Sequence, residues 1–408
     1  MKIVVLDTDA TTRSYCYQKI FEIVNNHKLP FTVISSSPDG FETEREAAIV
    51  VLGQSLVRKH TAQIAQLKRH HPKALFISYT PDYRLSLGFV EKLALLGVDE
   101  VFDADTSESE IKKRLIFGLH RVRQSEGFGG LVIVTSVKGG AGCTSIAMGM
   151  AEAIYLKGLS VCVIDFDLEY QNLSRFLMLK TISSQELADI LYGHRALSFE
   201  TVLTAIVDLN QEGTIGICLP PALSFEDIIS RDKALQLYAD ILNMLSHKYD
   251  ALILDLPCSC PRSIKETFMT LCDLGVLVVN PEPVSLVNFV NFCARVKSRF
   301  NYAASVGVIS NRYIEGGIPE RIIKAQAEES LNAVSFVDAI PFCSKARYWA
   351  GSRRTFLNLA SSSLRKAMET LANKSLHCLN LQDKVVRPEL ESSVKPLALP
   401  SVSLDNKG

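Results

Sequence analysis

The chain lacks three features that mark large classes of protein. It has no uninterrupted apolar run long enough to cross a membrane. Its 44 Lys and Arg residues equal its 44 Asp and Glu residues, so net charge favours neither nucleic acid nor an anionic membrane as a partner. The opening MKIVVLDTDATTR turns acidic after a short apolar run, which predicts a β-strand and not a secretory signal. We expect a cytoplasmic protein without a membrane anchor of its own and without bound nucleic acid.

The chain also lacks the C-x-x-C spacing of zinc and redox sites, although it has ten cysteines. Most of these are single residues inside apolar runs, as Cys162 and Cys218 are, which predicts buried free thiols in a reducing compartment. Cys258 and Cys260 lie closer together, but CSC is too short a spacing for either motif. We therefore expect no metal site built from cysteines.

Short apolar runs alternate with amphipathic stretches along most of the chain, which predicts two doubly wound α/β domains. In residues 1–125 the runs IVVL, FTVI, AIVVLG and ALFIS are typical of buried parallel strands. The stretch FVEKLALLG places Phe89, Leu93 and Leu96 on one helical face. A helix around ESEIKKRLIFGLHRVRQ closes this domain, and residues 126–130 have the glycine content of a linker.

The same pattern starts again in residues 131–381. The runs LVIVTS, VCVIDFD, TIGICLP, ALILDLP, GVLVVNPE and SVGVISN predict the strands of a second parallel sheet, and the last helix ends near Cys378. Residues 382–408 are rich in proline, serine and charge, which predicts a disordered tail. This tail shows no amphipathic period typical of a helix lying on a membrane.

The stretch VIVTSVKGGAGCTSIAMGM places a glycine-rich loop between a strand and a helix of small residues. In that context the backbone N–H groups and the helix N-terminus converge on an anion. The sequence therefore predicts a phosphate-binding loop over residues 138–145. Cys143 stands where a lysine would meet the phosphates, and its thiol is short and uncharged, so the site is expected to be weakened.

The loop resembles the deviant Walker A box, K-G-G-x-G-K-S/T, of the ParA/MinD superfamily. The resemblance implies a P-loop NTPase fold with a doubly wound parallel sheet. It implies that Lys138 is the signature lysine, which in that superfamily reaches across a dimer to the partner's nucleotide. Thr144 then matches the Mg²⁺ ligand, and Cys143 replaces the usual phosphate lysine.

Three further stretches resemble the same superfamily, in the expected order. In VCVIDFDLEYQNL, Asp165 matches the acid near Mg²⁺ and Asp167 the acid that positions the attacking water. YDALILDLP places Asp255 at the end of a Walker B strand, where a carboxylate can hold Mg²⁺-bound water. VISNRY places Asn311 and Arg312 where the superfamily binds adenine. Each acid alone could also be a loop cap, but four boxes in order favour a nucleotide site.

The resemblance implies ATP and Mg²⁺ as cofactors and a full set of site residues. Contact with the nucleotide is expected at Lys138, Gly139, Gly140, Ala141, Gly142, Cys143, Thr144, Ser145, Asn311 and Arg312. Contact with Mg²⁺ is expected at Thr144, Asp165 and Asp255, and a catalytic role at Asp167 and Lys138. Hydrolysis is expected to be weak or absent, because the charge of the phosphate lysine is missing.

The first domain resembles the receiver domain of response regulators without its chemistry. VLDTDATTR keeps Asp7 and Asp9, but the third strand ends in VVLGQS, with no carboxylate at residues 52–54. Ala104 stands where the lysine of a receiver is expected. Because a carboxylate nucleophile has no substitute, aspartyl phosphorylation is excluded. Asp7 and Asp9 are then expected to be turn and capping acids, and the domain to be a partner-binding module.

An atypical receiver followed by a MinD-like ATPase resembles the TadZ/CpaE group of type IVc (Tad/Flp) pilus assembly, over residues 1–380. The resemblance implies a homodimer that acts at the cell pole, on the inner face of the membrane, through partners in the pilus secretion machinery. Two alternatives stay open. One is a ParA-type partitioning ATPase that binds DNA, and the other is a structural scaffold that binds no nucleotide.

Overall fold

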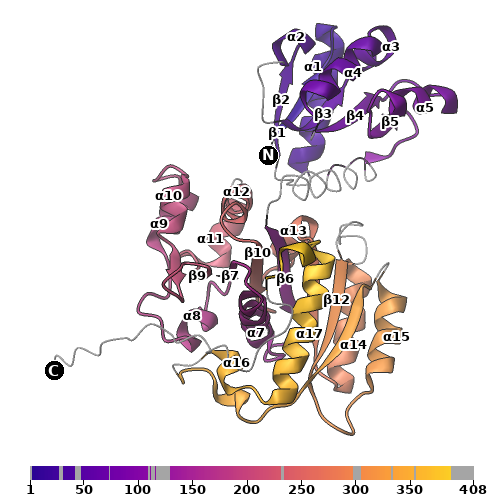
Figure 1. Cartoon of the computed structure of the whole chain (residues 1–408). Helices are drawn as coiled ribbons and strands as arrows, with labels where there is room; N and C mark the ends of the chain where they lie inside the picture. The colour runs from indigo at the N-terminus through magenta and orange to yellow at the C-terminus, as the bar shows by residue number, and fades with distance from the viewer. Residues whose placement is uncertain are drawn as a thin grey trace. The chain divides into compact units, whose positions relative to one another are not determined.

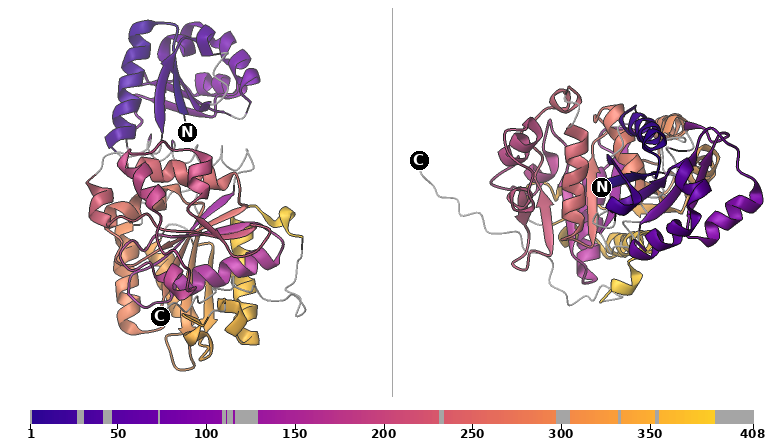
Figure 2. Two further views of the ribbon diagram at one scale, coloured as in Figure 1. Left: turned by 90° about the vertical axis from the view of Figure 1, so that its left-hand side faces the viewer. Right: turned by 90° about the horizontal axis from the view of Figure 1, so that it is seen from above.

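The computed structural model describes residues 2–26, 31–41, 47–72, 74–108, 111, 115, 129–230, 234–296, 305–331, 334–352 and 355–386, and the structural statements below concern these residues. The chain divides into two compact units, residues 1–127 and 128–408. Figures 1 and 2 show both units. Each unit has a sheet of its own and is described separately.

The first unit is a five-stranded parallel sheet. Its strands are β1 (Lys2–Leu6), β2 (Thr32–Ser36), β3 (Ala47–Leu52), β4 (Leu75–Thr80) and β5 (Glu100–Asp103). Its described helices are α1 (Ala10–Asn26), α2 (Pro38–Phe41), α3 (Gln54–Lys59), α4 (Thr61–His70) and α5 (Leu87–Leu95). The strand order β2-β1-β3-β4-β5 is that of a flavodoxin-like doubly wound sheet, which confirms the predicted fold class.

The helix predicted from FVEKLALLG is α5, and Leu93 is fully buried on it, with Phe89 and Leu96 packed against the same core. The helix predicted around ESEIKKRLIFGLHRVRQ falls almost entirely outside the described residues.

The second unit is built on an eight-stranded sheet. Its strands are β6 (Gly130–Ser136), β7 (Val161–Asp165), β8 (Ile206–Asp208), β9 (Ile215–Cys218), β10 (Ala251–Leu256), β11 (Leu274–Val279), β12 (Ser305–Tyr313) and β13 (Phe336–Pro341). The strand order is β13-β12-β11-β6-β10-β7-β9-β8. All neighbouring strands are parallel except β8, which runs antiparallel to β9. The predicted doubly wound parallel sheet is therefore confirmed, with an antiparallel strand added at one edge.

Helices cover both faces of this sheet (Figure 1). They are α7 (Cys143–Leu156), α8 (Asn172–Phe176), α9 (Gln185–Tyr192), α10 (Phe199–Leu203), α11 (Phe225–Ile229), α12 (Ala234–Ser246), α13 (Arg262–Leu271), α14 (Pro283–Val296), α15 (Glu320–Ser330), α16 (Phe356–Leu359) and α17 (Ser362–Cys378), with short 3-10 turns at Ala346–Tyr348 and Gln382–Lys384. Every residue of the central strands β6, β7, β10 and β11 is buried, because both faces are covered.

Two crossovers leave the centre of the sheet in opposite directions. From β6 the chain passes through α7 to β7, and from β10 it passes through α13 to β11 on the far side of β6. Because such crossovers are right-handed, α7 and α13 lie on opposite faces of the sheet. The carboxyl ends of β6 and β10 therefore meet at a point where the winding reverses, which is where doubly wound sheets bind ligands.

A buried carboxylate joins α7 to the C-terminal helices. Glu152 of α7 is 2% exposed and accepts hydrogen bonds from the backbone N–H groups of Phe356 and Leu357, at 2.8 and 3.0 Å. Burial raises the pKa of Glu152 to about 7. Since both donors belong to the first turn of α16, Glu152 fixes that helix against α7, the helix that follows the glycine loop.

The segment that follows α17 contacts the rest of the second unit. Residues 382–386, assigned to a disordered tail, begin with a 3-10 turn. The Lys384 ammonium lies 2.9 Å from a carboxylate oxygen of Asp250, and the N–H of Val386 donates to the carbonyl of Lys157. These contacts correct the start of the predicted tail, whose remainder, residues 387–408, lies outside the described residues.

Asp7 and Asp9, the two acids at the end of β1, accept hydrogen bonds from backbone N–H groups. Asp9 precedes α1 and accepts a 2.7 Å hydrogen bond from the N–H of Thr12, which is the geometry of a helix cap. The buried Asp7 carboxylate accepts from the N–H groups of Asp9 and Ser55, both at 3.1 Å. A Cβ on Gly53 would overlap the Asp7 carboxylate. The predicted roles as turn and capping acids are confirmed.

This geometry predicts that the first unit does not accept a phosphoryl group. No side chain fits at Gly53, and Asp7 is already occupied by backbone donors. Incubation of the full chain with acetyl phosphate, followed by intact-mass measurement, is expected to show no phosphate adduct. A phosphorylatable receiver treated in parallel is the positive control, and an acid-labile adduct within residues 1–125 would contradict the prediction.

Candidate functional site

The glycine loop between β6 and α7 has a backbone that side chains would not permit. Gly140 and Gly142 have φ values of +74° and +98°, in the left-handed region that favours glycine. A Cβ on Gly142 would also overlap the side-chain amide of Asn311. That amide donates a 2.7 Å hydrogen bond to the carbonyl of Ala141. The loop is therefore fixed to the end of β12, and residue 142 must be glycine for both reasons.

The backbone N–H groups of the loop are free to bind a ligand. Within the described part of the chain, no acceptor is hydrogen-bonded to the N–H of Gly139, Gly140, Ala141 or Cys143. These groups lead directly into the N-terminus of α7, where further N–H groups have no partner inside the helix. Such an arrangement favours negative charge, and it fits the phosphates of a nucleotide.

Cys143 is the first residue of α7, and its side chain turns inward. It is 9% exposed and belongs to the hydrophobic core around α7. Burial, reinforced by the nearby Asp255, raises the pKa of the Cys143 thiol to about 12. The thiol is therefore neutral at physiological pH, and position 143 supplies no charge to a bound phosphate.

Two buried carboxylates face each other across neighbouring strands. Asp165 ends β7, and the strand register pairs it directly with Asp255 of β10. Burial and the neighbouring charge of Asp165 raise the pKa of Asp255 to about 8, against a hydrogen bond from Thr144. Burial also raises the pKa of Asp165 to about 6. A cation placed between the two strands would remove this cost of burying like charges.

The expected metal ligands are brought together at one edge of the sheet, and all of them are oxygen donors, which Mg²⁺ prefers. Over the described residues, no group of three or more His, Cys, Asp or Glu side chains is placed to hold a metal by itself. An Mg²⁺ ion here would need further oxygens from phosphates. Mg²⁺ is commonly bound in this way, with one or two carboxylates plus substrate phosphates.

Asp167 follows β7 and is held in place by its neighbours. Its carboxylate accepts from the N–H of Tyr170 at 3.1 Å and from the side-chain amide of Asn172 at 2.6 Å. Its own N–H donates to Asp165 at 3.1 Å. Asp167 is 3% exposed, so these contacts fix its direction beside Asp165.

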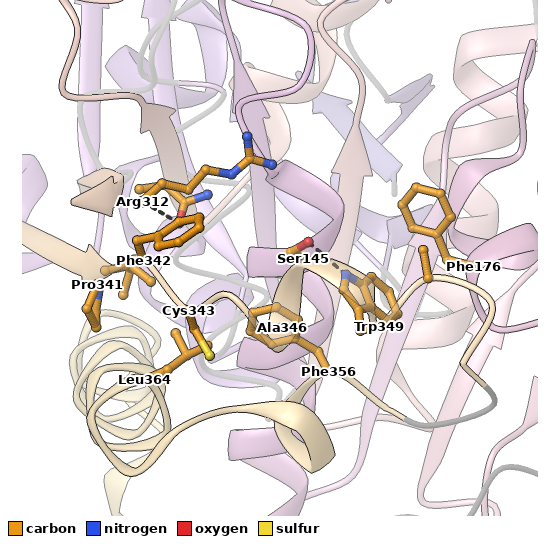
Figure 3. Close-up of a pocket in the computed structure, with 13 residues that line it drawn as sticks. Ser145, Phe176, Arg312, Pro341, Phe342, Cys343, Ala346, Trp349, Phe356 and Leu364 are labelled. Atoms are coloured by element: carbon orange, nitrogen blue, oxygen red, sulfur yellow. Dashed lines mark hydrogen bonds between the residues drawn. The ribbon is translucent and has the colours of Figure 1, made fainter. Parts of the chain in front are cut away.

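A cavity of about 440 Å³ adjoins the start of α7 (Figure 3). The indole N–H of Trp349 donates a 3.0 Å hydrogen bond to the hydroxyl of Ser145 at this cavity. Its volume and aromatic lining suit a planar base with its sugar. Its walls are Ser145, Phe176, Asn311, Arg312, Ile340, Pro341, Phe342, Cys343, Ala346, Trp349, Ala350, Phe356 and Leu364.

Of the cavity residues, sequence reasoning identified three, Ser145, Asn311 and Arg312, and missed the aromatic wall. The side chain of Asn311 is directed at the loop, and its oxygen accepts a 2.9 Å hydrogen bond from the N–H of Arg312. Arg312 has a φ of +60°. Trp349, the one tryptophan of the chain, was the local signal that could have indicated this aromatic wall.

Lys138, at the start of the loop, lies outside this cluster. Its ammonium lies 2.8 Å from a carboxylate oxygen of Glu282, and the two side chains are 41% and 57% exposed. Exposed ion pairs of this kind contribute about 0–1 kcal/mol to stability. Lys138 is therefore free to exchange Glu282 for another anion at little cost.

The comparison with protein families agrees with this geometry. The family described as the CobQ/CobB/MinD/ParA nucleotide binding domain matches residues 132–355, more than half of the chain. The chain belongs to this family. No helix in the described part of this family member is long and apolar enough to span a membrane.

Curated relatives match the chain over part of their length. An uncharacterized ATP-binding protein of Methanocaldococcus jannaschii is 29% identical over 185 residues, which cover 45% of this chain and 64% of that protein. The flagellum site-determining protein YlxH of Helicobacter pylori is 30% identical over 171 residues, which cover 41% of this chain and 53% of that protein. The chain thus spans less than two thirds of either relative.

Solved structures of the same family are similar at low identity. A ParA family ATPase from Chlorobium tepidum is 21% identical, covers 60% of this chain and 98% of its own, and has a TM-score of 0.49. The septum site-determining protein MinD of Pyrococcus horikoshii, solved in complex with Mg-ADP, is 24% identical, covers 60% of this chain and 96% of its own, and has a TM-score of 0.48.

A lysine at residue 143 tests what the cysteine has changed. Because a charge-assisted contact to phosphate contributes roughly 1.5–3 kcal/mol, Cys143→Lys is expected to tighten Mg-ATP binding about tenfold or more and to raise hydrolysis. Calorimetry and phosphate release measure the two effects. Cys143→Met, which adds length without charge, should change neither. If Cys143→Lys folds but changes neither ATP affinity nor hydrolysis, residues other than Cys143 have made the nucleotide site non-functional.

Proposed function

We propose that the chain is an ATP-binding, dimeric localisation factor that helps place the Tad/Flp pilus secretion machinery at the cell pole. One observation carries the proposal: the backbone cradle of the loop is complete while Cys143 supplies no charge to it. A site of this kind retains nucleotide and hydrolyses it slowly. The similarity to a flagellum site-determining protein and the TadZ/CpaE-like domain order support the localisation role.

The nucleotide site is assigned to the residues that the fold brings together. The N–H groups of residues 139–145 would hold the phosphates, and Thr144, Asp165 and Asp255 would face Mg²⁺, which when bound neutralises phosphate charge. The base would enter the cavity lined by Arg312. Loss of one charged contact weakens binding by about 10- to 150-fold, so a micromolar site becomes one of roughly tens to hundreds of micromolar.

Slow hydrolysis follows from the same residues. Transition-state charge on the phosphates needs preorganised positive groups, and position 143 provides none. Asp167 is the residue assigned to orient the attacking water, and its carboxylate is held by Tyr170 and Asn172. Such a protein acts through its nucleotide-bound form, and not through repeated ATP hydrolysis.

The dimer interface is assigned to the surface that carries the phosphate loop, residues 138–145. The pair between Lys138 and Glu282 is exposed and weak, so the phosphates of a nucleotide on a second copy can replace Glu282. Lys138 would then contribute to the partner's site, in the way that its family implies.

This assignment predicts opposite effects from the two members of the ion pair. Lys138→Ala is expected to weaken ATP-dependent dimers, because the contact with the partner's phosphates is lost. Glu282→Gln removes the competing anion and should leave dimers unchanged or stronger. Light scattering over a range of concentrations, with and without ATP, measures both. Lys324→Ala, which removes an exposed lysine paired with Glu328 on α15, is the matched control. Dimers unaffected by Lys138→Ala under every condition would contradict the assignment.

The localisation role is tested in cells. A fluorescently tagged chain is expected to form polar foci that depend on the other pilus components, and Asp167→Ala should keep these foci because hydrolysis is not the output. Diffuse Asp167→Ala protein at normal expression would show that turnover is required. Foci that follow the chromosome and are lost with added competitor DNA in extracts would favour a partitioning ATPase instead.

A further inference from the structure

A buried lysine on α13 forms no ion pair with a carboxylate among the described residues. Lys265 is in the second turn of α13 and is 7% exposed. Its ammonium donates a 2.8 Å hydrogen bond to the carbonyl of Cys258, and among the described residues no carboxylate forms an ion pair with it. An ammonium has three donors, so two of them have no described partner. Burying such a group is costly unless it is paired, so contact with an anion would stabilise it.

Lys265 belongs to α13, on the opposite face of the sheet to α7, and is bonded to the segment that follows β10. Cys258 follows β10, and a Cβ built on Gly139 would lie 3.6 Å from its sulfur, so the loop after β10 touches the phosphate loop. Burial lowers the pKa of Lys265, against the electrostatic effect of the thiols of Cys260, Cys258 and Cys143. The ammonium is therefore bonded to a segment that touches the phosphate loop.

We propose that Lys265 is an auxiliary phosphate lysine: it supplies to the bound nucleotide part of the positive charge that Cys143 does not. This inference rests on the proposed ATP binding of the same site. The two unpaired donors of Lys265 serve the phosphates, and the third keeps the bond to Cys258. A lysine at residue 143 would supply this charge directly, so ATP binding in Cys143→Lys is expected to depend less on Lys265.

A double-mutant cycle tests this dependence. The full-length chain, Lys265→Met, Cys143→Lys and the double variant are titrated with Mg-ATP by calorimetry. Lys265→Met is expected to weaken binding about tenfold or more when residue 143 is cysteine, and less than about threefold when residue 143 is lysine. Equal losses in both backgrounds, or no loss in the cysteine background, would overturn the proposal.

A second variant separates charge from structure. Lys265→Gln can still donate to the carbonyl of Cys258 but has no charge, so it should lose ATP affinity as Lys265→Met does and keep the unfolding temperature of the parent. This variant also keeps the proposal testable if Lys265→Met does not fold. Retained affinity in Lys265→Gln would show that the lysine only supports the loop after β10.

Arg262→Met is the matched control, because it removes an exposed cation, paired with Glu266, from the same helix. Its affinity should equal that of the unmodified chain. If the unmodified chain binds no Mg-ATP, the proposed function fails and the role of Lys265 fails with it. If the unmodified chain binds and both Lys265 variants bind equally well, only the role of Lys265 fails.

Discussion

The left-handed backbone at Gly142, held by Asn311, is the constraint on which the site depends. The side-chain amide of Asn311 occupies the space that a Cβ at residue 142 would need, and it binds the carbonyl of Ala141. This contact joins β12 to the loop and leaves the loop N–H groups pointing away from the protein's own acceptors. The start of α7, the acids of β7 and β10 and the aromatic cavity are then all arranged around this loop.

Ionisable groups of both signs are buried around this loop. Asp165 and Asp255 are buried opposite each other, and burial raises the pKa of both carboxyls. Lys265 is buried nearby without a described carboxylate partner. Groups of either sign are thus held out of water at a cost that Mg²⁺ and phosphates would offset. Replacement of the phosphate lysine by Cys143 removes one charge from a site that keeps its other groups.

Sequence reasoning found what is encoded locally. A glycine loop between a strand and a helix, and acids at strand ends such as Asp255, are visible as residue types at fixed spacing. The cavity was not predictable, because its walls come from segments far apart in the chain, and Trp349 meets Ser145 only after folding. Strand β8 was missed because its three residues follow a helix without a turn signal. The sequence did not indicate where Lys265 lies, because the residues of α13 have the pattern of an ordinary amphipathic helix.

The central claim is that the loop still binds nucleotide although its phosphate lysine is missing. The most direct test is calorimetric titration of the unmodified, full-length chain with Mg-ATP, beside Gly142→Val, whose side chain would displace Asn311 from the loop. The account predicts a dissociation constant of roughly tens to hundreds of micromolar for the unmodified chain and no binding for Gly142→Val. A folded, unmodified chain that releases no heat at about millimolar ATP would contradict it.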